Sequence, residues 1–269
     1  MQKHLIMIKN KIIFLIALTI GVFATSCKQN TVIEHVSTNE KLIFATLFVQ
    51  QSAEFKALSH QAYNIGRLQL DKAITENKGK KKLAIVLDID ETVLDNSPFE
   101  AKCILENTNY PTNWIEWCKE EKAESIAGAL DFINYASQNG VEVFYISNRK
   151  MEVFEATRTN LIKNGFPFAD STHMLLRTSV NDKEPRRALV SENFEIVLLF
   201  GDNLGDFTNL FDDKSTADRY TLVEEMKAEF GSRYIVLPNP MYGAWDAAMM
   251  HGLDIINKDS VYLARLKSF

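Results

Sequence analysis

The sequence predicts an α/β fold with a parallel sheet, and three observations support this prediction. Apolar runs at 83–87 (LAIVL), 141–146 (VEVFYI) and 195–201 (EIVLLFG) are each followed at once by polar residues. Helical stretches at 125–140 and 152–165, each ending in Gly, alternate with these runs. Near-continuous apolar strands that alternate with helices are typical of a parallel sheet covered on both faces. In such sheets ligands bind beyond the carboxyl ends of the strands, where all three polar clusters fall.

Residues 1–26 predict a signal peptide. Lys3, Lys9 and Lys11 precede an apolar segment (12–24) that is too short to span a membrane as a stable helix. Small residues then precede Cys27, which resembles the signal of bacterial lipoproteins, whose Cys becomes the lipidated first residue. A plain secretory signal or an uncleaved anchor is the alternative. The predicted organisation is a signal peptide (1–26), a tether (27–37) and one domain (38–269).

Two segments outside the alternation of strands and helices predict a cap. Residues 39–77 contain no Pro and a single Gly, and their apolar residues recur three and four apart, which predicts one or two amphipathic helices. Residues 96–123 contain two Pro and two Trp and interrupt the step from the first strand to the next helix. An insertion at that point lies over the carboxyl end of the first strand. The two segments are therefore expected to form a small, mainly helical cap.

Charge and cysteine content exclude some partners and sites. Three of the 30 basic residues lie in 1–26, which leaves 27 against 35 acidic residues and a formal charge of −8. An acidic chain lacks the basic footprint that a nucleic acid duplex requires. No Cys/His cluster has the spacing of zinc ligands. Cys103 and Cys118 could pair in an oxidising envelope or remain two buried free thiols, and the sequence leaves both alternatives open.

The segment that follows the first strand carries closely spaced acids. Asp88 and Asp90 are two residues apart in an extended segment, so both side chains leave on the same side. Two carboxylates held that close repel each other unless a cation or a shared proton lies between them. The spacing therefore indicates a metal site or an acid/base pair.

Four motifs in order resemble those of the haloacid dehalogenase superfamily. They are DIDET (88–92), SNR (147–149), the Lys183 of DKEPRR, and GDNLGDF (201–207). Within that superfamily the chain resembles the class C acid phosphatases, which are bacterial envelope enzymes and often lipoproteins. Further stretches such as NWIEWC and LPNPMYGAWDAAM extend the resemblance over essentially the whole mature chain. It implies a Rossmann-like parallel-sheet core with a small helical cap.

The resemblance implies a role for each motif residue. Asp88 is the expected nucleophile, which forms an aspartyl-phosphate, and Asp90 is the expected general acid and base. Mg²⁺, which prefers oxygen ligands, would be held by Asp88, by Asp202 and by the backbone carbonyl of Asp90. Asp206 would orient metal-bound water or the Lys. Donors to the phosphoryl oxygens are expected from Ser147, Asn148 and Lys183. Arg186 and Arg187 are expected to tie Lys183 or the sheet edge in place rather than to contact phosphate.

The resemblance also indicates what lies beyond the phosphate. Trp114 and Tyr242 match positions where class C relatives stack a nucleobase, whereas Trp117 and Trp245 are expected to pack the cap on the core. The predicted function is Mg²⁺-dependent hydrolysis of small phosphomonoesters, 5′-nucleotides among them, at the cell envelope, with Cys27 in the membrane. The alternatives are a non-catalytic envelope lipoprotein that keeps the fold for binding, and a phosphotransferase or phosphonatase.

Overall fold

The structure is a computed structural model that describes residues 41–79, 81–254 and 258–269. The predicted signal peptide, the tether and Cys27 lie outside the described residues. Within those ranges, every helix is too short or too polar to cross a bilayer. Cys103 and Cys118 are both buried and are not joined in a disulfide, which decides between the two alternatives that the sequence left open.

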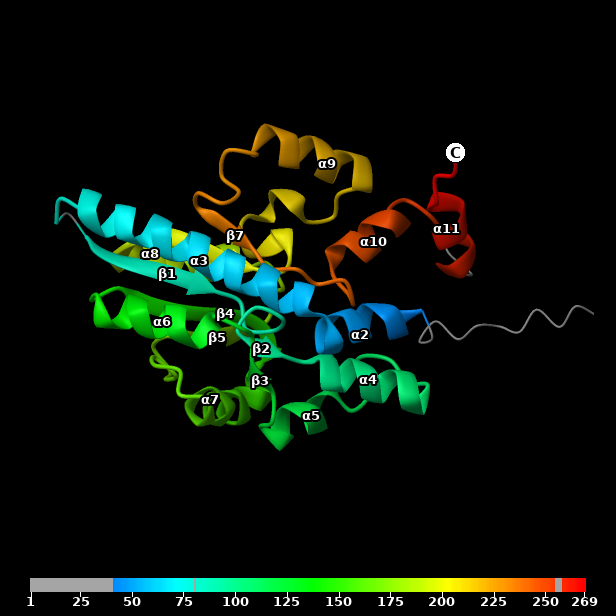
Figure 1. Cartoon of the computed structure of the whole chain (residues 1–269), viewed down its shortest axis with the longest axis horizontal. Helices are drawn as coiled ribbons and strands as arrows, with labels where there is room; N and C mark the ends of the chain where they lie inside the picture. The colour runs from blue at the N-terminus through cyan, green and yellow to red at the C-terminus, as the bar shows by residue number, and fades with distance from the viewer. Residues whose placement is uncertain (1–40, 80, 255–257) are drawn as a thin grey trace, which may run out of the picture. The chain divides into compact units, whose positions relative to one another are not determined.

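The core is a five-stranded sheet in which all neighbouring strands are parallel (Figure 1). In spatial order its strands are β5 (Met174–Arg177), β4 (Glu142–Lys150), β1 (Lys82–Leu87), β6 (Phe194–Gly201) and β7 (Tyr234–Val236). The three predicted strands are the three central ones, and the predicted α/β class is confirmed. The edge strands β5 and β7 have four and three residues, too few to form a distinctive apolar run.

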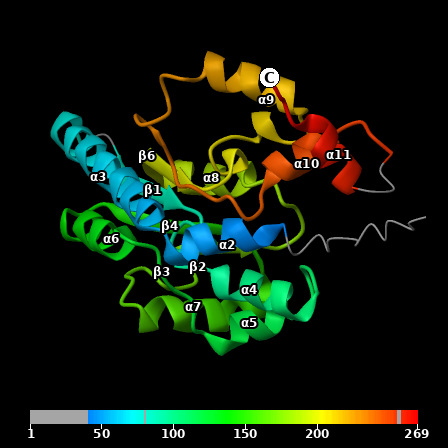
Figure 2. The same cartoon turned by 45° about the vertical axis from the view of Figure 1, so that its right-hand side comes forward.

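Side chains of the central strand divide between two hydrophobic clusters because successive residues of a strand point to opposite faces. Leu83, Ile85 and Leu87 join the larger cluster, which includes residues of α3 (Ala53–Glu76) and α6 (Ala129–Gln138). Their neighbours Ala84 and Val86 join the smaller cluster on the other face, which α8 (Glu184–Asn193) covers. Figure 2 shows the strands between α3 and α6 on one side and α8 on the other.

Helix α3 lies very close to the sheet. A Cβ added at Gly66 would lie 2.4 Å from Cζ of Phe200, so only Gly permits this approach. Tyr63 of the same helix stacks on Phe200, with ring centroids 5.4 Å apart. The expectation that all of 39–77 forms a cap is therefore wrong for α3, because its apolar face is buried against β6 and β7.

The remaining N-terminal helix meets the insertion. Helix α2 (Leu42–Gln51) is separated from α3 by Ser52, whose hydroxyl accepts the backbone N–H of Phe55 at 3.0 Å and caps α3. Helix α2 packs against α4 (Ser97–Glu106) of the insertion (Figure 1). The insertion also contains α5 (Trp114–Glu120), and a small antiparallel pair, β2 (Leu94–Asp95) with β3 (Glu124–Ser125), joins its two ends.

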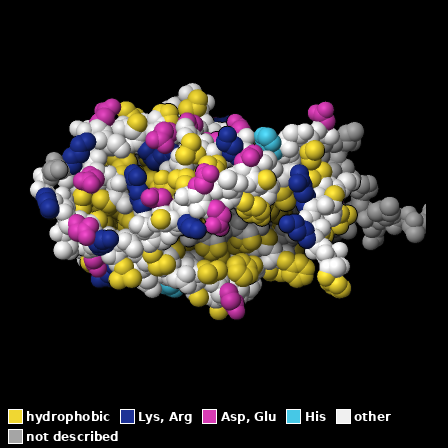
Figure 3. Space-filling model, turned by 90° about the horizontal axis from the view of Figure 1, so that it is seen from above, with side chains coloured by type: hydrophobic (Ala, Val, Ile, Leu, Met, Phe, Trp, Pro, Cys, Tyr) yellow, Lys and Arg dark blue, Asp and Glu magenta, His cyan; other side chains and the backbone are white. Residues whose placement is uncertain are grey.

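The 3₁₀ helix η1 (Met151–Val153) and helix α7 (Phe154–Lys163) follow β4 and pack against α5. The C-terminal part supplies elements whose residues line the pocket described below, namely the 3₁₀ helices Leu204–Asp206 (η2) and Asn209–Phe211 (η3) and helices α9 (Thr216–Glu225), α10 (Ala244–Met250) and α11 (Lys258–Arg265). On the face shown in Figure 3, Lys and Arg side chains are interspersed with Asp and Glu.

Candidate active site

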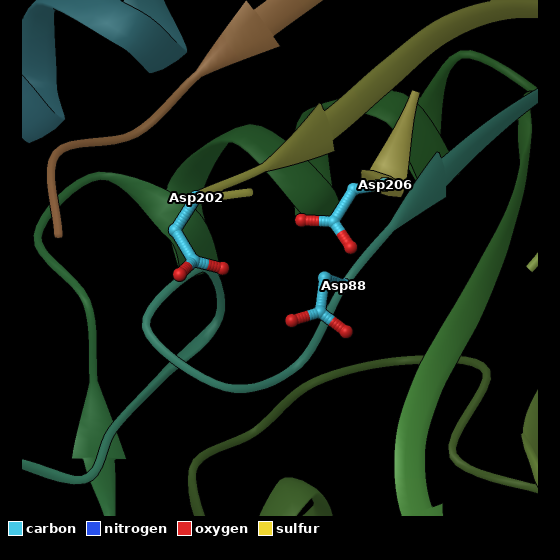
Figure 4. Close-up of side chains that lie close together, drawn as sticks. All are labelled: Asp88, Asp202 and Asp206. Atoms are coloured by element: carbon cyan, nitrogen blue, oxygen red, sulfur yellow. The ribbon is translucent and has the colours of Figure 1, made fainter. Parts of the chain in front are cut away.

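Three aspartates meet at the carboxyl ends of two neighbouring strands (Figure 4). Asp88 follows β1, Asp202 follows β6, and Asp206 lies in η2 one turn further on. One carboxylate oxygen of each lies within 4.8 Å of the others. A Cβ added at Gly201 would lie 2.3 Å from Oδ2 of Asp206, so the Gly that ends β6 leaves the space that this carboxylate occupies. The sequence predicted this convergence from two separate motifs, DIDET and GDNLGDF.

Lys183 binds two of these carboxylates. It precedes α8, its side chain is 6% exposed, and its Nζ donates to Asp88 and, at 2.6 Å, to Asp206. Burial alone lowers the pKa of a Lys, but Asp206 and Asp88 outweigh that effect and hold the pKa of Lys183 above its ordinary value. The ammonium is therefore charged across the range in which proteins are stable.

The cluster carries more negative than positive charge. Burial, together with Asp206 and Asp90, raises the pKa of Asp88 to about 7 even though Lys183 opposes the shift. Burial, Asp206 and Asp88 raise the pKa of Asp202 well above its ordinary range, although Asn239 Nδ2 donates to its Oδ2 at 2.8 Å. One ammonium among three carboxylates leaves a net charge of −2 when all are ionised. Oxygen-only donors with uncompensated negative charge fit a hard divalent cation such as Mg²⁺.

Asp90 is held by a different set of groups. Its Oδ1 accepts from Nε of Arg149 at 2.9 Å and lies 2.8 Å from Nη2 of the same guanidinium, and Asn96 Nδ2 donates to it at 2.9 Å. Its Oδ2 accepts from the Ser147 hydroxyl at 3.2 Å. The repulsion that the sequence predicts between Asp88 and Asp90 is thus offset at Asp90 by an Arg.

Arg149 and Asn96 were missed as functional candidates. The Arg149 side chain is 1% exposed, and its remaining donors reach the Thr157 hydroxyl and Asn96 Oδ1, each at 3.1 Å. Trp117, expected only to pack, also donates its ring N–H to Asn96 Oδ1 at 2.8 Å. The signal in the sequence was an Arg directly after an apolar strand and its polar turn. A buried guanidinium requires an acid partner, and Asp90 is that partner.

The expected phosphate donors occupy different environments. Ser147 is fully buried and its hydroxyl is used on Asp90, whereas Asn148 is exposed and lines the pocket. Arg186 donates to the Ser147 carbonyl at 2.7 Å and to Oδ1 of Asn148 at 2.6 Å. Arg187 donates to the Asp206 carbonyl at 2.8 Å. These contacts agree with the expectation that the two arginines tie the sheet edge in place.

A pocket of about 1380 Å³ connects these groups with aromatic side chains. Asp88, Lys183 and Asp202 line it, as do Phe99, Trp114 and Tyr242. The ring of Trp114 meets Phe99 edge-on, with centroids 5.0 Å apart, and the Arg149 guanidinium carbon lies 5.5 Å from the Trp114 centroid. Trp245 is 43% exposed and also lines the pocket, so it does not serve only as packing.

Comparison with known proteins agrees with this geometry. A soybean (Glycine max) protein, stem 31 kDa glycoprotein, is 27% identical over 165 residues, and the chain spans 58% of that protein's length, as it does of its own. The class C acid phosphatase from Bacillus anthracis is 44% identical, with a TM-score of 0.83 over 87% of this chain and 100% of that one. The same enzyme with tungstate bound gives the same values.

Residues 19–245 match the model of a family described as HAD superfamily, subfamily IIIB (acid phosphatase). The match covers the sheet, the insertion, Lys183 and all four motif aspartates. The chain belongs to the acid phosphatases of subfamily IIIB of the HAD superfamily.

Proposed function

We propose that this protein is a Mg²⁺-dependent acid phosphatase that hydrolyses phosphomonoesters, 5′-nucleotides among them, through an aspartyl-phosphate on Asp88. The observation that carries the proposal is the cluster of Asp88, Asp202 and Asp206 around Lys183 at the carboxyl ends of β1 and β6. Family membership supports the phosphatase activity. The cluster supports the metal and the nucleophile.

Asp88 and Asp202, with the backbone carbonyl of Asp90, are the groups proposed to hold Mg²⁺. The cation would neutralise the repulsion between a phosphate dianion and a carboxylate nucleophile. Asp206 is committed elsewhere, because its Oδ1 accepts from Lys183 and its Oδ2 accepts the Asn203 N–H at 2.9 Å. Its proposed role is to hold Lys183 in place.

The chain's own groups can perform both halves of the reaction. A carboxylate oxygen of Asp88 attacks phosphorus, the bond to the ester oxygen breaks, and Asp90 gives that oxygen a proton. In the second half the oxygen of a water molecule attacks phosphorus while Asp90 takes a proton from that water. The bond between phosphorus and the Asp88 oxygen breaks, which releases phosphate and restores the Asp88 carboxylate. Arg149 and Asn96 hold the Asp90 carboxyl in one orientation throughout. Lys183 places a fixed positive charge where phosphoryl oxygens gather negative charge.

The pocket supports a leaving group larger than glycerol. Trp114 and Tyr242 line the same pocket as the carboxylates, and both are half-buried rings with a face or edge still open to it. The proposed substrates are therefore nucleoside monophosphates, whose bases stack on aromatic rings with little regard to identity. The related Bacillus anthracis enzyme has been described with tungstate, an oxyanion of phosphate-like shape, which supports oxyanion binding in this family.

Phosphate release measures the proposal directly. The wild-type protein is assayed on 5′-nucleotides, sugar phosphates, glycerol phosphate and nitrophenyl phosphate, with Mg²⁺ and with a chelator. We expect turnover that depends on Mg²⁺, with lower KM for nucleotides. Asp90→Asn should lose more activity on alkyl esters than on nitrophenyl phosphate, because poor leaving groups depend more on protonation. Binding of phosphate esters without any release would instead favour the non-catalytic alternative.

The proposed location is the cell envelope, with Cys27 lipidated. The support is the charged start, the apolar 12–24 segment and the small residues before Cys27. The mature protein should partition into detergent, and Cys27→Ser should abolish that partitioning. Mass spectrometry that finds an unmodified amino terminus at another residue would show that the anchor is wrong.

A further inference from the structure

One buried carboxyl group in the pocket is not used by the proposed reaction. Glu100 lies in the first turn of α4, is 9% exposed and lines the pocket together with Phe99 and Trp114. Within the described part of the chain, its carboxylate has no hydrogen-bond or ion-pair partner, whereas its backbone N–H donates to the Asn96 carbonyl. Its side chain is therefore both withdrawn from bulk water and open to whatever fills the pocket.

The other buried acids of this region are all satisfied. Asp88 and Asp206 accept from Lys183, and Glu91 accepts the backbone N–H of Asn96 at 2.7 Å. Glu100 is the exception among them. The Glu100 carboxylate oxygens are not among the fully buried atoms without a partner in the described residues, so they keep some contact with the pocket. A carboxyl group that is largely withdrawn from water and has no protein partner still costs free energy, so this one requires an explanation.

Among the residues that the structure describes, no cation compensates the charge of Glu100. Burial raises the pKa of its carboxyl to about 7, and no neighbouring charge contributes to the shift. Perturbed acids that lie in a cleft are candidates for functional groups. A carboxyl in apolar surroundings forms strong hydrogen bonds with a donor that enters, because water does not compete there.

The position of Glu100 identifies what it can meet. Phe99, its neighbour in α4, packs edge-on against Trp114, and all three side chains line one pocket with the catalytic groups. The phosphoryl group belongs at Asp88 and Lys183, so the part of the substrate near Trp114 is its leaving group. An acceptor at that place interacts with the N–H or O–H donors of the leaving group, such as a base amine or a sugar hydroxyl.

We propose that Glu100 is a specificity-determining residue that accepts a hydrogen bond from an N–H or O–H donor of the leaving group. It thereby favours phosphomonoesters of donor-bearing alcohols, such as nucleosides, over esters of purely apolar alcohols. The inference rests on the proposed function and extends it. Stacking accepts any ring, whereas hydrogen bonding accepts only a leaving group that has a donor. Sites built to bond a substrate donor reject analogues that lack it far more strongly than apolar pockets reject a change of size.

Two variants and four substrates test this inference. Glu100→Met keeps an unbranched side chain of similar volume and removes the acceptor, and Glu100→Gln keeps a neutral acceptor. The substrates are adenosine 5′-monophosphate, its analogue without the base amine, its analogue without the ribose hydroxyls, and phenyl phosphate, which has a ring but no donor. KM and kcat are measured with Mg²⁺.

For adenosine 5′-monophosphate, Glu100→Met should raise KM roughly tenfold with kcat changed little, since the loss of one hydrogen bond has about this size. Glu100→Gln should raise KM less. Phenyl phosphate should keep its KM in both variants. The two analogues identify the donor. The analogue that lacks the donor should already have a raised KM with the wild-type protein, and Glu100→Met should not raise that KM further.

Glu106→Gln is the matched control. Glu106 lies on the same helix, is exposed, and binds Lys102 and Asn113 instead of lining the pocket. It should leave every KM unchanged. If Glu100→Met does not fold, a rise in KM for adenosine 5′-monophosphate but not for phenyl phosphate in Glu100→Gln still supports the inference.

Equal changes for adenosine 5′-monophosphate and phenyl phosphate, or no change for either, would overturn the role of Glu100 alone. A wild-type protein that releases phosphate from none of the four esters would overturn the proposed function and the inference together. Thermal unfolding of all variants identifies a purely structural role, since that role would lower Tm without separating the substrates.

Discussion

The two walls of the pocket are built in opposite ways. The sheet wall consists of Asp88, Lys183, Asp202 and Asp206, and among them Lys183 binds two carboxylates while Asn239 binds a third. The insertion wall consists of Phe99, Glu100 and Trp114. The rings of Phe99 and Trp114 pack edge-on, and the carboxylate of Glu100 has no partner among the described residues.

This difference assigns the reaction to the sheet wall and the choice of substrate to the insertion wall. Carboxylates of the sheet wall follow the ends of strands that are fixed by parallel pairing with their neighbours. Their positions are therefore rigid, which suits a reaction that tolerates little displacement of the reacting groups. The insertion wall comes from two short helices outside the sheet, so its side chains can change without altering the carboxylate cluster. Substitutions on the first wall should affect kcat, and those on the second wall should affect KM.

The largest effect is expected at the nucleophile. Asp88→Asn keeps the size of the side chain and removes its nucleophilicity, so kcat should fall by about four orders of magnitude or more. Phosphate release and circular dichroism measure activity and folding. Asp131→Asn, an exposed acid in α6, is the control and should change neither. Retention of more than a small fraction of the activity would show that Asp88 is not the nucleophile.

Removal of the Lys183 ammonium from the sheet wall should destabilise the fold. In Mg²⁺-free protein, Lys183→Met leaves two buried carboxylates unpaired, and the free energy of unfolding should fall by about 3–5 kcal/mol at neutral pH. The double variant Asp88→Asn/Lys183→Met should recover part of this loss, because one of the two charges is gone. Urea unfolding measures both, with the exposed Lys122→Met as control. A loss below about 1 kcal/mol would show that the pair is unimportant for stability.

The insertion wall should respond to pH through Glu100. Its pKa rises on folding from 4.5 to about 7, so the folded state holds the proton more tightly than the unfolded state. Wild-type stability therefore falls as pH rises through this window, and Glu100→Gln should escape that fall. The difference in free energy of unfolding between Glu100→Gln and the wild type should grow by at most about 3 kcal/mol as pH rises, and then stay constant above pH 7. Urea unfolding from pH 4.5 to 8 measures it, and a flat difference would contradict the prediction.

The smallest effect is expected at the rings. Trp114→Ala or Tyr242→Ala should raise the KM for nucleotides about tenfold while sparing glycerol phosphate, because a stacked ring contributes about 1–3 kcal/mol. Steady-state kinetics on both substrates distinguish stacking from packing. Tyr220→Ala on α9 is the control, since that ring is 69% exposed. Equal losses on both esters, or a collapse in protein yield, would show that the rings are structural.

The sequence located the central strands and the convergence of three motifs because both depend on local patterns. Strands β1 and β4 are buried along most of their length and β6 along its second half, and all three contain continuous apolar runs, whereas the short edge strands gave no such signal. Helix α3 was assigned to the cap because periodicity identifies an apolar face without identifying what covers it. The sheet covers it, at Phe200.

The partners of the acids could not be predicted from the sequence. Arg149 and Asp90 are 59 residues apart along the chain, and their contact follows from the register of β1 against β4. Asn239 meets Asp202 only because β7 pairs with β6. The isolation of Glu100 is likewise a property of three-dimensional packing, since any acid of the insertion could have found a Lys nearby.

The sequence by itself determined the α/β class, the strand ends that carry carboxylates, and the residue types that suit a phosphate ester and a hard cation. These follow from apolar periodicity and from the chemistry of single side chains, both of which are written in short segments. Only the tertiary structure decided which carboxylate is paired with Lys183, which with Arg149, and which with nothing. Those choices depend on distances of a few ångströms between segments far apart in the chain, and such distances are set by strand register and by the packing of helices on the sheet.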